Sequence, residues 1–394
     1  MREDGGGSTR IIKNAGCIED ERKQLEQRGL EQQWKKPRMS NKHVVIAMSG
    51  GVDSSVSAAL LKAEGFQVTG VSLQLYDPAP KEPGGRVKTC CSLDDVLDAG
   101  RVAKKLGIPF EVIDLRAEFK KLVVDYFIAE YAAGRTPNPC IRCNDLIKFE
   151  LLLQKAKEMG ADLLATGHYA RTEVDDAGRK WLLTGLDPAK DQSYFLFMLN
   201  QEQLRQVVFP VGMLEKPQVR KLAAEFDLPV AQKHESQEIC FIPDNDYVGF
   251  LESHGVVRNP GEIVTGEGAV VGRHLGLHRY TVGQRRGLGV AWSHPLHVVA
   301  LDTELNRVVT GGRDELLRQT LAAGNATWSS LPETMEFHAT CRIRYRHRPA
   351  PCRVVLLAEN RFEVHFDNPQ TSITPGQAAV LYDGDRVLGG GWIE

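Results

Sequence analysis

Hydrophobic and polar residues follow a strand–helix rhythm through the first half of the chain. Residues 44–48 form an apolar run typical of a buried strand, and a Ser-Gly-Gly turn separates them from a predicted helix at 54–64. Glycines follow this helix and several later ones, as expected at helix C-termini. The pattern predicts further strands at 67–75, 110–115 and 162–166, and further helices at 94–106, 118–133, 144–159 and 217–226. Strands separated by single helices predict βαβ units and a parallel sheet.

The pattern changes after about residue 245, where glycines become dense and the apolar runs become short. The last part of the chain predicts strands at 336–345, 352–357, 361–366 and 378–382. So many short strands pack most naturally as a compact β-barrel. The expected architecture is therefore α/β, with a parallel-sheet domain at 43–245, a small β-rich domain at 246–315 and a C-terminal β-barrel at 316–394.

Composition narrows the class of protein. The 394 residues are 42% hydrophobic with a net charge of −2, and the chain contains neither an apolar run long enough to span a membrane nor a secretory h-region. Eight cysteines are too few for a disulfide scaffold. Residues 1–42 carry ten basic and seven acidic residues with few large apolar ones, which predicts a disordered extension. We therefore expect a cytoplasmic, monomeric protein.

The strongest motif lies between the first strand and the first helix. It reads Ser49-Gly50-Gly51-Val52-Asp53-Ser54-Ser55. The glycines allow a tight turn whose N–H groups can face phosphate oxygens, and the helix N-terminus adds partial positive charge. The motif lacks the lysine of a Walker A loop, so no lysine is expected at the terminal phosphate, which disfavours γ-phosphoryl transfer.

This motif resembles the SGGxDS signature of the PP-loop ATP pyrophosphatases, whose fold is an adenine-nucleotide α-hydrolase. The resemblance implies that ATP adenylates a substrate oxygen and releases pyrophosphate, with Mg²⁺ positioned in part by Asp53. The nucleotide-binding residues that it implies are Ala47, Met48, Ser49, Gly50, Gly51, Val52, Asp53, Ser54, Leu73 and Gly167.

A Cys-x-x-Cys pair, Cys140 and Cys143, stands directly before a predicted helix. A thiol at a helix N-terminus beside Arg142 is expected to have a lowered pKa and to be nucleophilic. One such pair is weak evidence for zinc, and redox chemistry, sulfur chemistry or an iron–sulfur site with a third cysteine compete with it. Cys240 lies near the end of the same domain and, taken alone, is typical of a buried structural cysteine.

Longer blocks widen the resemblance to the bacterial tRNA 2-thiouridylases, the MnmA enzymes. These blocks are RTPNPCIRCNDLIKF at 135–149, ATGHYAR at 165–171, KDQSYF at 190–195, FPVGMLEKPQVR at 209–220, QEICFI at 237–242, YTVGQRRGLG at 280–289 and TPGQ at 374–377. The resemblance covers residues 43–394. It implies that ATP adenylates O2 of the wobble uridine (position 34), that Cys240 carries sulfur as a persulfide from a donor protein, and that Cys143 then attacks and forms a disulfide with Cys240.

Cys140 departs from the family pattern, because many members carry Asp at this position with an acid/base role. A cysteine there could transfer the proton, act as a resolving thiol, or join Cys143 and Cys240 in holding an iron–sulfur cluster. We rank the cluster below the persulfide route. The other cysteines carry no motif and are expected to be structural; they are Cys17, Cys90, Cys91, Cys341 and Cys352.

Local charge indicates RNA binding in spite of the neutral total. Residues 270–290 carry Arg273, Arg279, Arg285 and Arg286 without an acid, and residues 341–353 carry five arginines without an acid. Four of these five, at 342, 344, 346 and 348, would share one face of the strand predicted at 336–345 and its extension, as a row suited to phosphates.

The resemblance also implies a set of tRNA contacts and partners. The implied tRNA-binding residues are Asn138, Pro139, Cys140, His168, Lys190, Asp191, Gln192, Arg344, Tyr345 and Gln377. The implied partners are tRNAs of the Lys, Glu and Gln type and a sulfur-donor protein. Two alternatives stay open: another PP-loop adenylating enzyme, such as an amidotransferase or ligase, and a non-catalytic RNA-binding or iron–sulfur protein.

Overall fold

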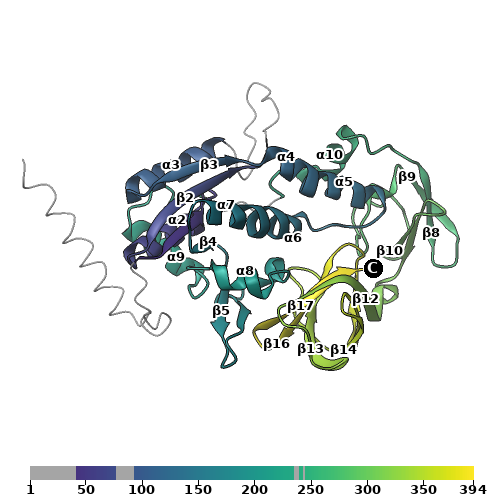
Figure 1. Ribbon diagram of the computed structural model, residues 1–394. Helices are drawn as coiled ribbons and strands as arrows, with labels where there is room; N and C mark the ends of the chain where they lie inside the picture. The colour runs from purple at the N-terminus through teal and green to yellow at the C-terminus, as the bar shows by residue number, and fades with distance from the viewer. Residues whose placement is uncertain (1–40, 77–92, 235–238, 243–244) are drawn as a thin grey trace, which may run out of the picture.

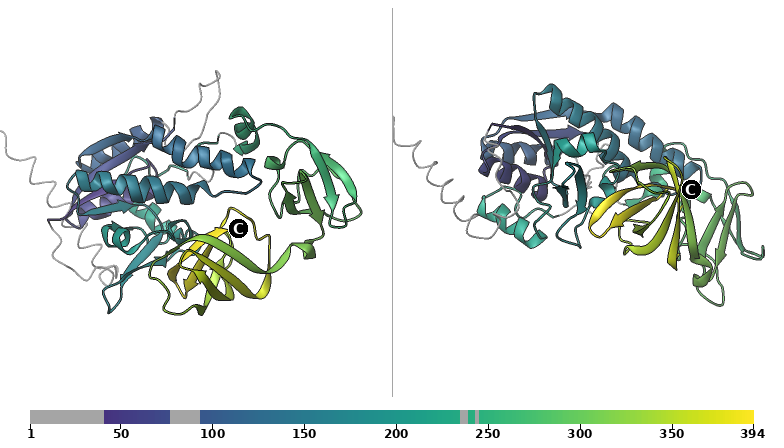
Figure 2. Two further views of the ribbon diagram at one scale, coloured as in Figure 1. Left: turned by 45° about the vertical axis from the view of Figure 1, so that its right-hand side comes forward. Right: turned by 60° about the horizontal axis from the view of Figure 1, so that its bottom comes forward.

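The computed structural model describes residues 41–76, 93–234, 239–242 and 245–394. The extension predicted at 1–42 falls almost entirely outside these residues, as do Cys17, Cys90 and Cys91. The described residues form three sheets, and Figures 1 and 2 show the parallel sheet, the small central sheet and the C-terminal barrel in three different parts of the molecule.

The first sheet is parallel, as predicted. Its strands are β1 (His43–Ala47), β2 (Gln67–Gln74), β3 (Phe110–Asp114), β4 (Leu163–Thr166) and β7 (Val207–Val208), in the order β3-β2-β1-β4-β7. β1 lies in the centre, and its residues Val44, Val45 and Ile46 are completely buried. The two-residue strand β7 has no sequence signature, because it is too short to show a period.

Helices cover both faces of this sheet. On one face lie α2 (Val52–Ala63), α3 (Leu93–Leu106) and α9 (Lys216–Glu225), which share a core with Val44 and Ile46. On the other face lie two long helices built from consecutive segments, α4–η2–α5 (Arg116–Phe119, Lys120–Val124, Asp125–Ala132) and α6–η3–α7 (Pro139–Arg142, Cys143–Leu151, Leu152–Glu158). Three shorter elements are η4 (Ser193–Leu196), α8 (Gln201–Gln206) and α10 (Tyr247–Ser253).

The helix expected at 144–159 begins earlier than predicted. Its N-cap is Asn138, whose side-chain oxygen accepts the N–H of Ile141 at 3.3 Å, and Pro139 occupies the first turn. Asn144, the first residue of the predicted helix, is buried inside the observed helix and donates to the carbonyl of Phe195 at 3.2 Å. Both cysteines of the Cys-x-x-Cys pair therefore lie within the helix rather than before it.

The central sheet has four strands in the order β10-β11-β8-β9. They are β8 (Gly261–Thr265), β9 (Val270–His274), β10 (His297–Asp302) and β11 (Arg307–Gly311). A small core that includes Ile263, Val298 and Val308 holds them together. A 3-10 turn, η6 (Leu277–Arg279), contacts α5 of the first domain and α10.

The last six strands form a closed antiparallel barrel, which confirms the predicted class. They are β12 (Leu317–Trp328), β13 (Glu336–Arg342), β14 (Ala350–Ala358), β15 (Arg361–Thr371), β16 (Ala378–Asp383) and β17 (Arg386–Ile393). β12 pairs with both β15 and β17, and this double pairing closes the barrel. The hairpin of β5 (Ala170–Val174) and β6 (Lys180–Thr184) extends from the first domain and pairs with β17.

The barrel and the first domain share one hydrophobic core. Ala378, Val380 and Val387 of the barrel belong to the same buried cluster as Tyr194 and Phe197 of the first domain. No helix among the residues that the structure describes is long and apolar enough to cross a membrane.

Candidate active site

The Ser-Gly-Gly loop joins the carboxyl end of β1 to the N-terminus of α2, where a phosphate site is expected. Gly50 has a φ of +69°, and a Cβ there would lie 2.1 Å from the carbonyl oxygen of Asp95, so no other residue fits. The Ser54 hydroxyl accepts the N–H of Ser49 at 3.2 Å, and the Ser55 hydroxyl donates to the Gly51 carbonyl at 2.7 Å. The loop is therefore rigidly folded over the start of the helix.

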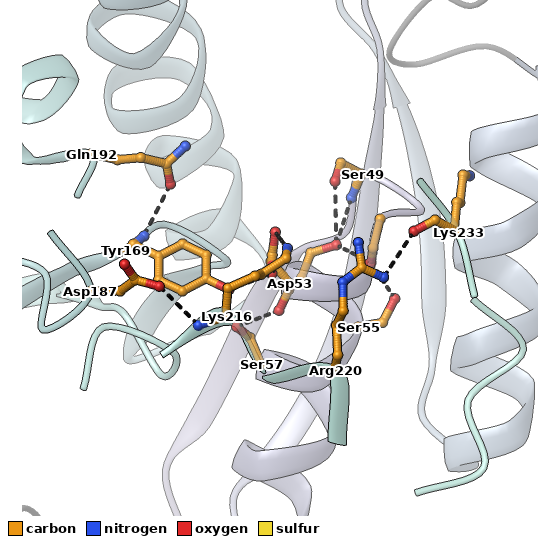
Figure 3. Close-up of polar contacts among 12 residues, drawn as sticks. Ser49, Asp53, Ser55, Ser57, Tyr169, Asp187, Gln192, Lys216, Arg220 and Lys233 are labelled. Carbon is orange, nitrogen blue, oxygen red and sulfur yellow. Dashed lines mark hydrogen bonds and ion pairs between the residues drawn. The ribbon is translucent and has the colours of Figure 1, made fainter. Parts of the chain in front are cut away.

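Asp53, in the first turn of α2, is held by two side chains from distant parts of the chain (Figure 3). Lys216 Nζ lies 2.7 Å and 2.8 Å from the two carboxylate oxygens. The Tyr169 hydroxyl donates to Oδ1 at 2.7 Å. The Asp53 carboxylate, the residue expected to help position Mg²⁺, is thus neutralised by a lysine in this structure.

A second lysine supports the loop from the other side. Lys233 Nζ donates to the carbonyl of Gly50 at 3.0 Å and pairs with Asp95 and Asp98 at 2.7 Å and 2.6 Å. These carboxylates belong to α3, so Lys233 ties the loop to that helix. The two carboxylates raise the pKa of Lys233 against the effect of burial, which keeps it charged.

Two lysines from outside the motif lie at the loop, and the expectation that no lysine reaches the terminal phosphate stays a prediction. The motif itself contains none, but Lys216 and Lys233 reach it across 163 and 183 residues of sequence. Lys216 lies in the 209–220 block, directly before Pro217 at the start of α9. The sequence block contains Lys216, but it does not show which residue the lysine contacts in the folded protein.

Gly167 and His168 follow the end of β4 beside the loop. A Cβ on Gly167 would lie 2.6 Å from the backbone nitrogen of Ser54, so this glycine allows the two segments to touch. His168 is buried, and its Nδ1 lies 2.6 Å from the Thr166 hydroxyl. Burial, aided by the nearby charge of Lys148, holds the pKa of His168 well below its usual value, which favours the neutral ring. Its contact with RNA stays a prediction.

The remaining residues expected at the nucleotide form the wall of the site. Met48, Val52 and Leu73 are buried, and Ala47 is half-buried at the end of β1. The N–H of Met48 donates to the carbonyl of Val71 at 2.7 Å, which continues the pairing of β1 with β2. Their direct contact with a nucleotide stays a prediction.

The cysteines occupy two different environments. Cys140 is exposed in the first turn of α6, whereas Cys143 is buried and belongs to the large core cluster. Burial raises the pKa of the Cys143 thiol, and the charge of Lys148 lowers it by less. The expectation of a lowered pKa is therefore wrong for Cys143 in this state, because desolvation outweighs the helix N-terminus. The Arg142 guanidinium lies over the Tyr126 ring, 4.7 Å from its centroid.

Cys240 is half-buried and packs against the same core cluster that contains Cys143. Both cysteines thus border the same large hydrophobic core, and their reaction with one another stays a prediction. No group of three or more His, Cys, Asp or Glu side chains within the described part of the chain is arranged to hold a metal. The three cysteines named as alternative iron–sulfur ligands do not form such a group here.

Asp191, expected at the tRNA, has a buried side chain in this structure. Its Oδ1 accepts the N–H groups of Gly185 and Ser193 at 3.0 Å and 3.1 Å. Its Oδ2 accepts from the Ser193 hydroxyl at 3.1 Å and from Arg342 at 2.6 Å. Arg342 also lies over the ring of Tyr382, 4.9 Å from its centroid. This carboxylate therefore holds a barrel arginine against the first domain.

The arginine row expected on one strand face is also wrong. β13 ends at Arg342, and residues 343–349 form bends and turns. Arg342 is paired with Asp191, and Arg344 donates to the carbonyl of Thr371 at 3.1 Å. Arg346 and Arg348 are exposed, so they remain available to phosphates. The alternating arginines do not form a row because β13 ends at the first of them, Arg342.

In the 270–290 segment, Arg279 pairs with Glu252 while Arg273, Arg285 and Arg286 are exposed. Elsewhere, Tyr345 packs on the ring of Phe195 with centroids 4.4 Å apart, and the Gln192 side chain accepts the N–H of Tyr169 at 3.0 Å. Lys190 is half-buried beside them, and Pro139 is buried in the first turn of α6.

Gln377 supports the loop that precedes the cysteines. Its amide nitrogen donates to the carbonyls of Thr136 and Pro137 at 2.8 Å and 3.3 Å. The N–H of Thr136 donates to the carbonyl of Pro375 at 2.9 Å, and its hydroxyl donates to that of Thr281 in the central domain at 3.3 Å. All three domains therefore meet at Thr136, two residues before the cap of α6.

Three domain families match the chain in this order. The family described as "tRNA methyl transferase HUP domain" matches residues 42–244, "tRNA methyl transferase PRC-barrel domain" matches 248–312, and "Aminomethyltransferase beta-barrel domain" matches 318–393. The tRNA-specific 2-thiouridylase MnmA of Geobacter metallireducens is 58% identical over 360 residues, which is 90% of this chain and 97% of the relative. This chain belongs to the MnmA family. The MnmA of Geotalea uraniireducens is 57% identical over 357 residues, 90% of this chain and 95% of the relative.

Membership in the MnmA family confirms the resemblance carried by the sequence blocks. Among solved structures, the U34-tRNA thiolase NcsA from Methanococcus maripaludis with its [4Fe-4S] cluster is 18% identical and gives a TM-score of 0.35, covering 60% of this chain and 74% of that chain. A likeness this weak carries no inference about the ligands of the MnmA family chain described here.

Proposed function

We propose that this chain is an ATP-dependent tRNA-uridine 2-sulfurtransferase that converts the wobble uridine, position 34, to 2-thiouridine and releases AMP and pyrophosphate. One observation carries the proposal. This chain is 58% identical, over 90% of its length, to a tRNA-specific 2-thiouridylase, and it carries the Ser-Gly-Gly loop between β1 and α2 together with Cys143 and Cys240.

The first half of the reaction is adenylation. The uracil O2 attacks the α-phosphate of ATP, the bond to the β-phosphate breaks, and pyrophosphate leaves. This step is needed because a uracil carbonyl oxygen is a poor leaving group until it is an AMP ester. The loop N–H groups and the N-terminus of α2 stabilise the negative charge on the phosphates. Asp53 supplies a carboxylate of the kind that Mg²⁺ prefers, and the ion, when bound, neutralises phosphate charge.

The second half is sulfur transfer. The terminal sulfur of a Cys240 persulfide attacks C2, and AMP leaves with the former O2. The Cys143 thiolate then attacks the Cys240 sulfur, which forms a disulfide and releases the sulfur on C2 as the thiocarbonyl. A reductant returns both thiols, and a sulfur-donor protein reloads Cys240. Burial keeps Cys143 protonated before this step, so it must lose its proton once the substrate is bound.

The tRNA is expected to lie over exposed basic residues of the barrel and of the central domain. Exposed Arg346 and Arg348 belong to the barrel, and exposed Arg285 and Arg286 belong to the central domain. Arginines without a nearby acid are suited to phosphates. The wobble base must leave the anticodon stack to reach C2 chemistry. By family resemblance the substrates are tRNAs of the Lys, Glu and Gln type.

Cys240→Ser provides the direct test. The variant should release AMP and pyrophosphate with tRNA present but form no 2-thiouridine, measured by the retardation of thiolated tRNA in mercury-containing gels. Cys352→Ala, which changes a cysteine of the barrel core, is the matched control and should thiolate normally. Loss of both half-reactions in Cys240→Ser would indicate a structural cysteine and contradict the proposal.

Cys140 has its own test. If its thiol transfers a proton, Cys140→Asp should retain thiolation and Cys140→Ala should lose most of it. Protein purified without oxygen should contain no stoichiometric iron or acid-labile sulfide. Iron bound in stoichiometric amount, and lost in Cys140→Ala, would overturn the persulfide route.

A further inference from the structure

Lys148 is a half-buried cation in η3, and the reaction proposed above gives it no role. Its ammonium donates to the side-chain oxygen of Asn144 at 2.9 Å. Among the residues that the structure describes, no carboxylate pairs with it: Asp145 lies 4.0 Å from Arg142 instead, and Glu150 is exposed. A half-buried charge without a counter-charge costs free energy of folding, and such exceptions are expected at functional sites.

The local helix geometry aligns Lys148 with Cys143. Both belong to η3, in which hydrogen bonds join residues five apart; the N–H of Leu152, for example, donates to the carbonyl of Ile147. In such a π-helix, residues five apart follow one another on one face. An α-helix, with about 3.6 residues per turn, would instead turn Lys148 by about 140° away from the cysteine. The π-helix therefore places the amine on the side of the thiol.

The same ammonium lies near the nucleotide loop. Phe149, the next residue of η3, packs on the His168 ring with centroids 6.0 Å apart. After burial, the charge of Lys148 is the second cause that lowers the pKa of His168, and it also lowers the pKa of the Cys143 thiol against the larger effect of burial. His168 directly follows Gly167, which touches the first turn of α2. Lys148 is thus close both to the cysteine and to the segment that borders the loop.

The proposed reaction needs a positive charge at such a place. Adenylation removes the N3 proton of the uracil and leaves a C2=N3 double bond, with the phosphate at the loop and C2 toward the cysteines. When the terminal persulfide sulfur bonds to C2, the electron pair of this double bond moves to N3 and, by conjugation, to O4. The pair returns as the C2–O2 bond breaks and AMP leaves. Negative charge therefore develops on the uracil ring during sulfur attack.

We propose that Lys148 is a catalytic residue that moves from Asn144 to the uracil ring and stabilises the negative charge formed when the persulfide attacks C2. The four-carbon stem allows this movement without a change in the helix, and Asn144 stays in place because it donates to the carbonyl of Phe195 at 3.2 Å. During adenylation the ring gives electrons to phosphorus, so a cation beside it brings no advantage there. The inference rests on the proposed 2-thiolation and assigns the lysine to its second half.

The first test measures the two half-reactions separately, with full-length protein, ATP and tRNA. Lys148→Met should release its burst of pyrophosphate within about threefold of the wild-type rate, but form 2-thiouridine about 100- to 1000-fold more slowly in single turnovers. Lys148→Arg keeps the charge and should restore part of the rate. Lys148→Gln keeps only a donor to Asn144 and should not; it also replaces the Met variant if that one is unstable. Lys155→Met, which changes an exposed lysine of α7 that donates to Glu158 at 2.8 Å, is the matched control.

A second test separates the uracil ring from the Cys143 thiol as the group on which Lys148 acts. A Cys143→Ala protein is loaded with persulfide at Cys240 by a cysteine desulfurase and L-cysteine, and the same protein without L-cysteine gives the background. Sulfur attack on C2 still releases AMP in this protein, because Cys143 is needed only afterwards. Adding Lys148→Met should slow the release of AMP about 100-fold or more.

Three results would overturn the inference. The first is thiolation by Lys148→Met at the wild-type rate. The second is equal release of AMP by Cys143→Ala with and without Lys148→Met, which would show that the lysine acts through the thiol. The third is an equal slowing of both half-reactions in the Met and Arg variants alike, which would mark a structural lysine. Failure of the proposed function looks different, because the wild-type protein would then form no 2-thiouridine.

Discussion

Replacing Asp191 by alanine should destabilise the protein far more than it weakens tRNA binding. The carboxylate is 3% exposed and accepts four hydrogen bonds, from the Gly185 and Ser193 N–H groups, the Ser193 hydroxyl and Arg342. Its loss leaves the Arg342 guanidinium, only 15% exposed, without its counter-charge. Breaking a buried ion pair in this way costs about 3–5 kcal/mol. At roughly 2–4 °C per kcal/mol, the midpoint of thermal unfolding should fall by about 6–20 °C.

Arg346→Ala is the matched contrast, because this arginine is exposed on the same barrel. Its free energy of unfolding should change by no more than about 0.5 kcal/mol. Its affinity for tRNA should fall, and the slope of log affinity against log salt concentration should decrease by about one unit. Thermal unfolding is followed by circular dichroism, and tRNA binding by filter retention at several salt concentrations. The double variant Asp191→Ala/Arg342→Leu should recover part of the stability, since it removes the orphaned charge.

The reasoning is refuted if Asp191→Ala unfolds at the wild-type temperature but binds tRNA more weakly than Arg346→Ala does. That outcome would place the carboxylate at the RNA in spite of its burial. A loss of stability that Arg342→Leu does not reduce would instead show that the two backbone N–H groups, rather than the ion pair, depend on Asp191.

Three further predictions follow from the geometry of the site. Gly167→Ala should weaken ATP binding at least about tenfold in calorimetry, because its Cβ would lie 2.6 Å from the Ser54 nitrogen. Gly100→Ala is the control, since Gly100 lies in the middle of a helix and its Cβ would lie 3.5 Å from the Phe110 ring. This variant should bind ATP normally and be more stable by about 0.5–1 kcal/mol. Because burial raises the pKa of Cys143, its thiolate forms only at a higher pH than that of an ordinary thiol. Iodoacetamide should therefore label Cys143 more slowly than exposed Cys140 at pH 7, and the labelling rate should still rise above pH 9. Equal labelling of the two cysteines, measured by mass spectrometry, would contradict this. Gln377→Ala removes two hydrogen bonds to the loop before the cysteines. Single-turnover thiolation should therefore slow about 2- to 10-fold, while the affinity for tRNA stays nearly unchanged. A loss of tRNA affinity alone would instead assign Gln377 to RNA binding.

Much of the fold was predictable because local pattern and burial agree. The apolar run of β1 predicts a central strand, and that strand is fully buried. Helices such as α3 end where Gly107, in the left-handed region, stops them. The start of α6 was missed because two Asn residues could each have been a cap, and only the packing of Asn144 against Phe195 decides between them.

The candidate site divides in the same way. The Ser-Gly-Gly motif and the CxxC pair were recognisable in the sequence because each needs particular residue types at a fixed spacing, whereas Cys240 was singled out only by the family resemblance. The thiol pKa of Cys143 was predicted in the wrong direction, since the helix N-terminus is a local feature whereas desolvation depends on what packs around it. The prediction of an arginine row was wrong for a related reason. Arginines continue to alternate in the sequence after β13 has ended.

By itself the sequence determined the order of the three domains and the position of the nucleotide loop, because these depend on contiguous residues. Only the tertiary structure decided which charges act together. It brings Lys216 to Asp53 across 163 residues and Arg342 to Asp191 across 151. The strength of such pairs depends on separation in space and on exclusion of water, and a linear pattern records neither.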